Sequence, residues 1–167
     1  MVALWIAETA INRIDEKEEY HRFCRETIDL CWEWFVNRKV DRWDIYDRVT
    51  YEEVNLLDIV INTDKRDSDL SDKYDMILVG VTYAAWQAFN YDEEAYGYPE
   101  DLNEMSDEEF ERVVNIWIDQ KAIDHSRYES LLCYLKPESV KFNPIKCKES
   151  KLAVKEKVIE MIQNQSV

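Results

Sequence analysis

The sequence contains very little glycine and proline. Its 167 residues include two glycines and three prolines, and neither type occurs before Gly80. An all-β fold needs a turn about every ten residues and usually builds its turns from glycine and proline. We therefore expect an all-α fold, with residues 1–167 forming a single compact multi-helix domain.

The sequence also lacks a long apolar run and a basic leader. The longest apolar stretch, residues 76–89, is shorter than the roughly 20 residues that cross a bilayer. Glu8 interrupts the first apolar residues, where an export signal would stay apolar. Cys24, Cys31, Cys133 and Cys147 form no CxxC pair, which is typical of reduced thiols. We expect a cytoplasmic protein that does not contact a membrane.

Groups for catalysis or metal binding are scarce. His21 and His125 are the only histidines, and Glu18 with His21 supplies half of a di-iron pattern whose second half is missing. Residues 67–78 imitate a calcium loop but lack its central glycine and its final glutamate. No nucleophile elbow, phosphate-binding glycine loop or zinc-protease motif occurs. We therefore expect no catalytic residue, no metal and no cofactor.

Apolar residues recur at spacings of three and four along most of the chain, which predicts helices. The expected helices cover residues 3–14, 18–38, 42–62, 71–90, 125–135 and 148–163, with a further one after Ser106. Connections are expected as an acidic hinge loop at about 91–106 and an irregular segment at about 136–147. Ser106 and Glu109 form a capping box for the helix that follows.

The helix at residues 72–90 is apolar on both faces, so we expect it to be buried at the centre, with Ser71 as its cap. Gly80 and the alanines after it would let neighbouring helices approach closely. Trp32 and Trp43 are not assigned to the core and are expected at the surface. The predicted core includes Trp34, Val81, Phe89, Val113 and Trp117.

Basic residues are absent from one long segment. Residues 74–111 contain eleven acids and no lysine, arginine or histidine, in a chain whose net charge is −15. Such asymmetry favours a directed surface for a basic partner, and it argues against nucleic acid, whose phosphates would be repelled. Within this segment, tyrosines alternate with acids, and tyrosines are effective interface residues. The predicted partner-binding residues are Tyr91, Asp92, Glu93, Glu94, Tyr96, Tyr98, Glu100, Asp101 and Glu104.

Three segments carry a resemblance to a known family: Leu4–Thr9, Phe23–Trp34 and Val81–Phe89. In these the chain resembles the mostly helical immunity proteins of bacterial polymorphic-toxin and contact-dependent growth inhibition systems, and above all the immunity family numbered six. The resemblance implies a protein that is made beside a toxin domain, often a nuclease, and that blocks the toxin's substrate surface. Two alternatives stay open: a helical adaptor or regulator of another basic partner, and a small enzyme whose site no motif marks.

Overall fold

The computed structural model describes residues 1–91, 97–135 and 148–163, and every regular element among them is a helix. The all-α prediction is confirmed for this part of the chain. The elements are α1 (Val2–Ile11), α2 (His21–Asn37), α3 (Arg42–Thr50), α4 (Leu56–Asp64), α5 (Ser68–Tyr91), the 3-10 helix η1 (Glu100–Glu104), α6 (Asp107–Asp119), α7 (His125–Leu135) and α8 (Lys148–Gln163).

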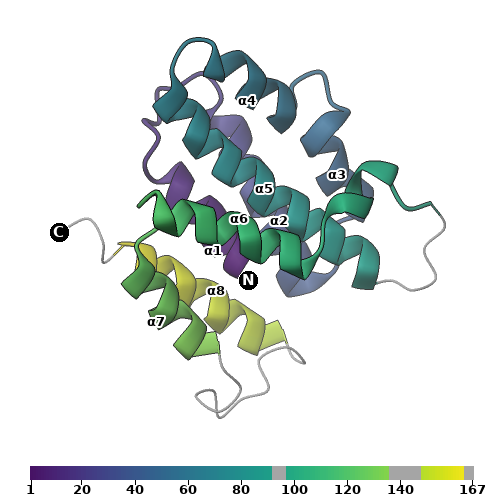
Figure 1. The fold of residues 1–167 in the computed structure, drawn as a ribbon. Coiled ribbons are helices and arrows are strands. Elements are labelled where there is room, and N and C mark those ends of the chain that lie inside the picture. The colour runs from purple at the N-terminus through teal and green to yellow at the C-terminus, as the bar shows by residue number, and fades with distance from the viewer. Residues whose placement is uncertain (92–96, 136–147, 164–167) are drawn as a thin grey trace.

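Helix α5 runs through the middle of the molecule and packs against α1, α2, α3 and α4 (Figure 1). Helix α8 packs on α1 and α2, while Tyr128 of α7 contacts the ring of Trp5 in α1, with ring centroids 6.4 Å apart. The predicted central helix is therefore present, although it is longer than expected at both ends. None of the described helices combines the length and apolar character needed to cross a membrane.

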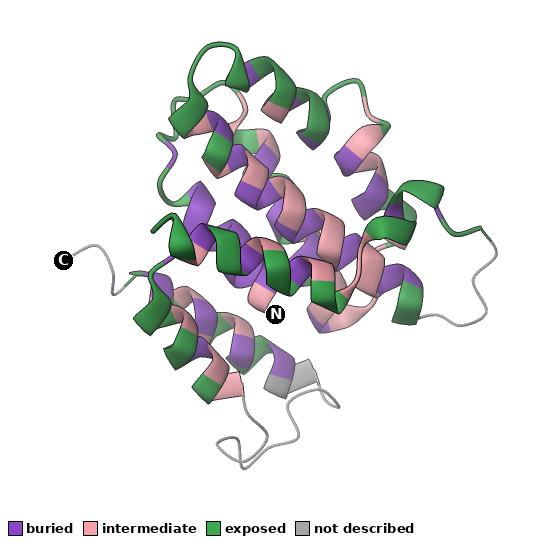
Figure 2. Ribbon diagram, viewed as in Figure 1, coloured by how far each residue is buried: buried purple, intermediate pink, exposed green. Residues whose placement is uncertain are grey.

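Helix α1 is enclosed on all sides, and each of its residues from Ala3 to Ile11 is buried (Figure 2). Its closest neighbour is α5 at Gly80. A Cβ atom built on Gly80 would lie 2.7 Å from the carbonyl oxygen of Ala3 and 3.2 Å from Cβ of Ala7. The expected close approach of helices is confirmed, because only a residue without a side chain lets these two backbones come so near.

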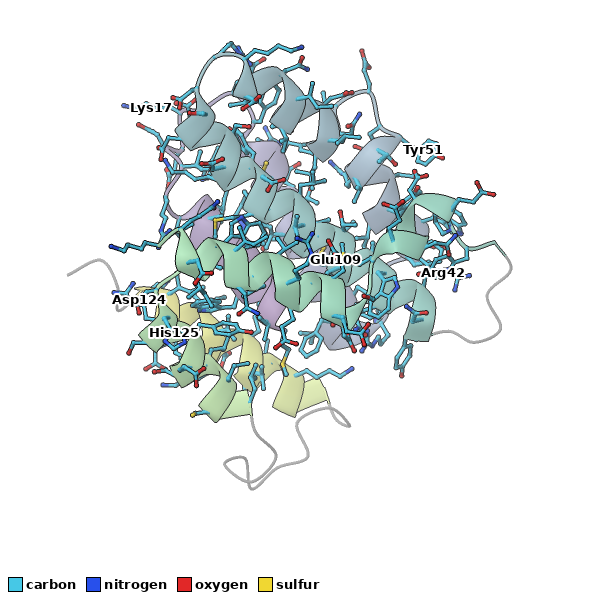
Figure 3. All side chains as sticks on the ribbon, in the orientation of Figure 1. Lys17, Arg42, Tyr51, Glu109, Asp124 and His125 are labelled. Carbon is cyan, nitrogen blue, oxygen red and sulfur yellow. The ribbon has the colours of Figure 1, made fainter. Side chains whose placement is uncertain are left out.

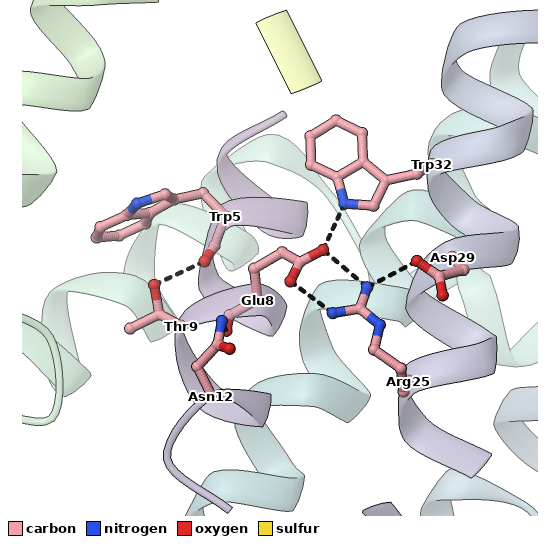
Figure 4. Close-up of polar contacts among 7 residues, drawn as sticks. All are labelled: Trp5, Glu8, Thr9, Asn12, Arg25, Asp29 and Trp32. Atoms are coloured by element: carbon pink, nitrogen blue, oxygen red, sulfur yellow. Dashed lines mark hydrogen bonds and ion pairs between the residues drawn. The ribbon is translucent and has the colours of Figure 1, made fainter. Parts of the chain in front are cut away.

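Helix α1 carries a carboxylate, Glu8, into the core, where its side chain is satisfied by α2 (Figure 4). Arg25 donates to Oε2 of Glu8 at 2.6 Å and to Oε1 at 2.8 Å, and the indole Nε1–H of Trp32 donates to Oε1 at 2.8 Å. A buried charge is tolerated when it is paired and hydrogen-bonded in this way. The network therefore fixes α2 relative to α1.

The predicted helix at 42–62 is wrong in one respect: the structure divides it into α3 and α4. Asn55 is the reason, because its side chain accepts a hydrogen bond from the backbone N–H of Asp58 at 2.9 Å and so caps a new helix. Asn55 is itself buried, which fixes the turn between α3 and α4 in the core.

The predicted cap of α5 is also wrong. The helix begins at Ser68, and Asp67 caps it by accepting from the backbone N–H of Leu70 at 3.1 Å. Ser71 lies inside the helix, where its hydroxyl donates to the carbonyl of Val60 in α4 at 3.2 Å. For α6, the serine half of the predicted capping box is confirmed, since the Ser106 side chain accepts from the backbone N–H of Glu109 at 3.1 Å.

The core contains most of the predicted residues. Val81, Phe89 and Trp117 are buried, as expected, whereas Trp34 and Val113 are only partly buried. Trp32, which was expected at the surface, is fully buried because Glu8 accepts its indole N–H inside the core. The expected acidic loop is shorter than predicted, since Tyr91 belongs to α5 and residues 100–104 form η1. The irregular segment 136–147 lies outside the described residues.

The contact at Gly80 leads to a stability prediction. Gly80→Ala should lower the free energy of unfolding by about 1–3 kcal/mol, because the new methyl group meets backbone that cannot move aside. This loss should appear although alanine in a helix interior is about 1 kcal/mol more favourable than glycine. Urea unfolding followed by circular dichroism measures the change. Unchanged or higher stability would contradict the close packing of α1 on α5.

The Glu8 network gives a second prediction with a matched control. Glu8→Ala should cost about 2–4 kcal/mol of stability, since it strips the partner from a half-buried arginine and from the Trp32 indole. Asp29→Ala removes the other carboxylate that binds Arg25. The Asp29 side chain is 58% exposed and accepts from Arg25 at 3.0 Å. That change should cost less than about 1 kcal/mol. Equal losses in the two variants, measured by urea unfolding, would refute a structural role for Glu8.

Candidate functional site

The predicted partner-binding residues fall into two groups. Asp92, Glu93, Glu94 and Tyr96 lie outside the described residues. The other five, all exposed, come from the C-terminal end of α5 and from the segment that contains η1: Tyr91, Tyr98, Glu100, Asp101 and Glu104. These two segments lie at one side of the molecule, next to the start of α3 (Figure 1).

An aromatic cluster centred on Phe89 joins the two segments. The ring of Phe89 lies 4.9 Å from that of Trp43 and 5.8 Å from that of Tyr98, measured between centroids. Phe89 is buried, but Trp43 and Tyr98 are each 37% exposed. Gly97 has a φ of 82°, a conformation that suits glycine, and lies against the Trp43 ring. The cluster therefore presents two half-exposed aromatic edges beside the acids.

The η1 segment is attached firmly to the core. Pro99 and Leu102 are buried, and the hydroxyl of Tyr46 donates to Oδ2 of Asp101 at 3.0 Å. Burial, chiefly, raises the pKa of Tyr46 to about 12, so this hydroxyl keeps its proton at neutral pH. Asp101 thus has a structural partner. Glu100 and Glu104 are exposed and form no ion pair with any described residue, which leaves their charges available.

Sequence reasoning missed two cations beside this surface. The acidic run contains no base, yet the fold places Arg38 with its Cζ atom 4.3 Å from the Tyr91 ring centroid. The Cζ atom of Arg42 lies 4.9 Å from the ring centroid of Phe89. Residues at the ends of α2 and α5 and at the start of α3 line an open cavity of about 450 Å³ here, and Trp34, Arg38 and Tyr91 are among them. Figure 3 shows Arg42 on this side of the molecule and His125 at the far end, at the start of α7.

The described cysteine and histidine side chains offer no reactive group at this surface. Cys24 and Cys31 are buried, and burial raises the pKa of each thiol to about 12, which keeps both protonated and unreactive at neutral pH. His125 lies on the surface, 3.9 Å from Glu129. Among residues 1–91, 97–135 and 148–163, no three histidines, cysteines or acids gather in a way that could hold a metal ion.

Fold and surface together define an all-α protein that presents acids and aromatic edges beside a cavity. The family described as "Immunity protein Imm6" matches residues 1–120, well over half of the chain, and the protein belongs to this family. This confirms the resemblance inferred from the sequence and supports an immunity role. The match includes α1 to α6 and the whole acidic and aromatic surface, whereas α7 and α8 lie beyond it. No curated protein and no solved structure matches the chain.

Proposed function

We propose that this protein neutralises a cognate toxin domain, a nuclease with a basic cleft, by covering that cleft with the surface around Tyr91 to Glu104. The observation that carries the proposal is the placement of Glu100 and Glu104, exposed and without ion pairs in the described structure, beside the half-exposed rings of Trp43 and Tyr98. A nuclease cleft is built to receive phosphates, so carboxylates at similar spacing compete with its substrate.

The acids and the aromatic rings have different tasks in this proposal. Exposed charges accelerate encounter with an oppositely charged cleft and repel acidic competitors, but they add little lasting affinity. Affinity comes from large side chains that lose water on binding, chiefly tryptophan, tyrosine and arginine. Tyr91 is 65% exposed and offers the largest such area among the described predicted residues. Blocking a cleft requires no chemistry of the inhibitor's own, so we propose no enzymatic activity.

The steering role predicts an effect on the association rate. Glu100→Lys combined with Glu104→Lys should slow association with the cognate toxin domain by at least about tenfold at low salt. The effect should shrink as salt rises, because the interaction is screened. Stopped-flow binding to a catalytically inactive toxin variant measures it. Asp101 is left unchanged, since Tyr46 donates to it.

A control separates local from overall charge. Glu16→Lys combined with Glu156→Lys changes net charge equally at two exposed positions in the loop before α2 and in α8. This control should alter the association rate by less than about threefold. If both double variants slow association to the same degree, net charge alone is responsible and the proposed surface is wrong.

Two exposed large side chains allow a controlled test of affinity. Tyr91→Ala should speed dissociation of the toxin roughly thirtyfold, corresponding to a hot-spot loss of about 2 kcal/mol. Ile61→Ala, at a position 47% exposed in α4, should change the dissociation rate less than about twofold. Surface plasmon resonance distinguishes the two variants. The opposite order would move the interface to α4.

A further inference from the structure

Arg38, one of the two cations that the sequence did not link to the acidic surface, occupies an unusual position. Arg38 follows α2 in the left-handed conformation, with φ of 56°. Its Cζ atom lies 3.6 Å from the ring centroid of Trp34 and 4.3 Å from that of Tyr91. Arg38, Trp34 and Tyr91 line both the cavity of about 450 Å³ and a neighbouring cavity of about 260 Å³ whose other walls include α1. We call the two cavities together the Arg38 groove.

The guanidinium in this groove lacks an acceptor. Its Nε and Nη1 atoms are buried and have no hydrogen-bond partner in the described structure. Stacking on Trp34 stabilises the face of the cation, but it leaves the N–H groups in the plane without acceptors. Buried donors in folded proteins are nearly always bonded, so these two are an exception that a ligand would remove.

A second cation lies near the ring of Phe35, which Arg38 also approaches. Lys151 of α8 is 7% exposed, and its Nζ atom lies 5.7 Å from the ring centroid of Phe35, while Cζ of Arg38 lies 5.9 Å from that centroid. Neither cation forms an ion pair within the described parts of the chain. Burial and then repulsion from Arg38 lower the pKa of Lys151. The larger cavity has one acid in its wall, Asp41, which accepts from the backbone N–H of Trp43 at 2.9 Å and caps α3.

We propose that the Arg38 groove binds one carboxylate side chain, an aspartate or glutamate, of the toxin domain. The carboxylate accepts hydrogen bonds from the Arg38 guanidinium, and Lys151 adds a second positive charge. The volume and the aromatic walls suit a protein side chain together with its neighbours, where a small free anion would leave the groove largely empty. This inference rests on the proposed function and names a contact within the same interface.

The groove would give the interface its register. Basic residues of the toxin lie opposite Glu100 and Glu104, and a single acid lies opposite Arg38, so the charge pattern matches in only one orientation. A toxin with a basic residue in place of that acid would place like charges together in a confined site. The Arg38 groove therefore separates a cognate toxin from other basic proteins, which the acidic surface alone cannot do.

The chain offers a matched pair of variants. Lys121 also adopts a left-handed conformation, with φ of 61°, just after α6. Arg38→Gly and Lys121→Gly each remove one positive charge at a position where glycine is unstrained, so both should fold. Arg38→Gln serves as a second variant that keeps a long polar side chain without the charge. Circular dichroism and urea unfolding confirm that each variant is folded before binding is measured.

The measurement is binding of a catalytically inactive variant of the cognate toxin domain. Arg38→Gly and Arg38→Gln should each weaken binding at least about tenfold, mainly through faster dissociation, whereas Lys121→Gly should stay within about twofold of the unchanged protein. Affinities of both Arg38 variants within twofold of Lys121→Gly would overturn the carboxylate site. If, in that case, reversal of Glu100 and Glu104 still slows association, the proposed function stands and only this inference falls.

A separate experiment tests the carboxylate site even if the proposed function is wrong. If the unchanged protein does not bind the toxin domain, the site is tested with acetate as the probe and acetamide as its neutral match. Acetate should shift the Nε–Hε resonance of Arg38 in a ¹H–¹⁵N spectrum, and acetamide should not. The same small shift with both probes, or none with either, overturns the site.

Discussion

The approach of α5 to α1 at Gly80 is the constraint on which the other packing depends. It places the longest helix directly on the most buried one, with the Gly80 backbone against the Ala3 carbonyl. The remaining helices then cover these two: α2 is tied to α1 by Glu8, Arg25 and Trp32, and α3 and α4 pack on α5. A longer side chain at position 80 would separate α5 from α1 and weaken all of these contacts together.

The same packing assembles the surface. Because α1 supports both α2 and α5, the end of α2 and the end of α5 meet beside the start of α3, which brings Trp34, Arg38 and Tyr91 together. Residues distant in sequence thus form one surface region with two kinds of charge. Acids on η1 face outward, and a cation lies in the groove beside them. Under the proposed function, the acids attract a basic partner and the groove selects among such partners.

Local patterns predicted much of the fold. The 3-4 spacing of apolar residues gave the helices, and the Ser106 cap and the span of α8 follow from signals within a few residues. The break before α4 was also readable, since Asn55 and Asp58 have the spacing of a cap. It was missed because the branched residues around it continue the apolar pattern across the turn.

The remaining differences arise from contacts between distant segments, which spacing does not reveal. Trp32 and Trp34 lie at opposite edges of the apolar stripe of α2. Trp32 is the buried one, and the Glu8 carboxylate of α1 accepts its indole N–H. The acidic and aromatic residues of the candidate surface were identifiable from composition. Arg38 was not, because its link to Tyr91 spans more than fifty residues and depends on the packing of α2 against α5.

The central claim is that the partner covers the region where α2, α3, α5 and η1 meet. Amide hydrogen exchange of the protein, alone and saturated with its cognate toxin domain, tests this claim most directly. The account predicts that new protection is strongest in residues 34–43 and 97–104. Protection confined to residues 51–61, where Tyr51, Val54, Leu57 and Ile61 are exposed, would contradict it.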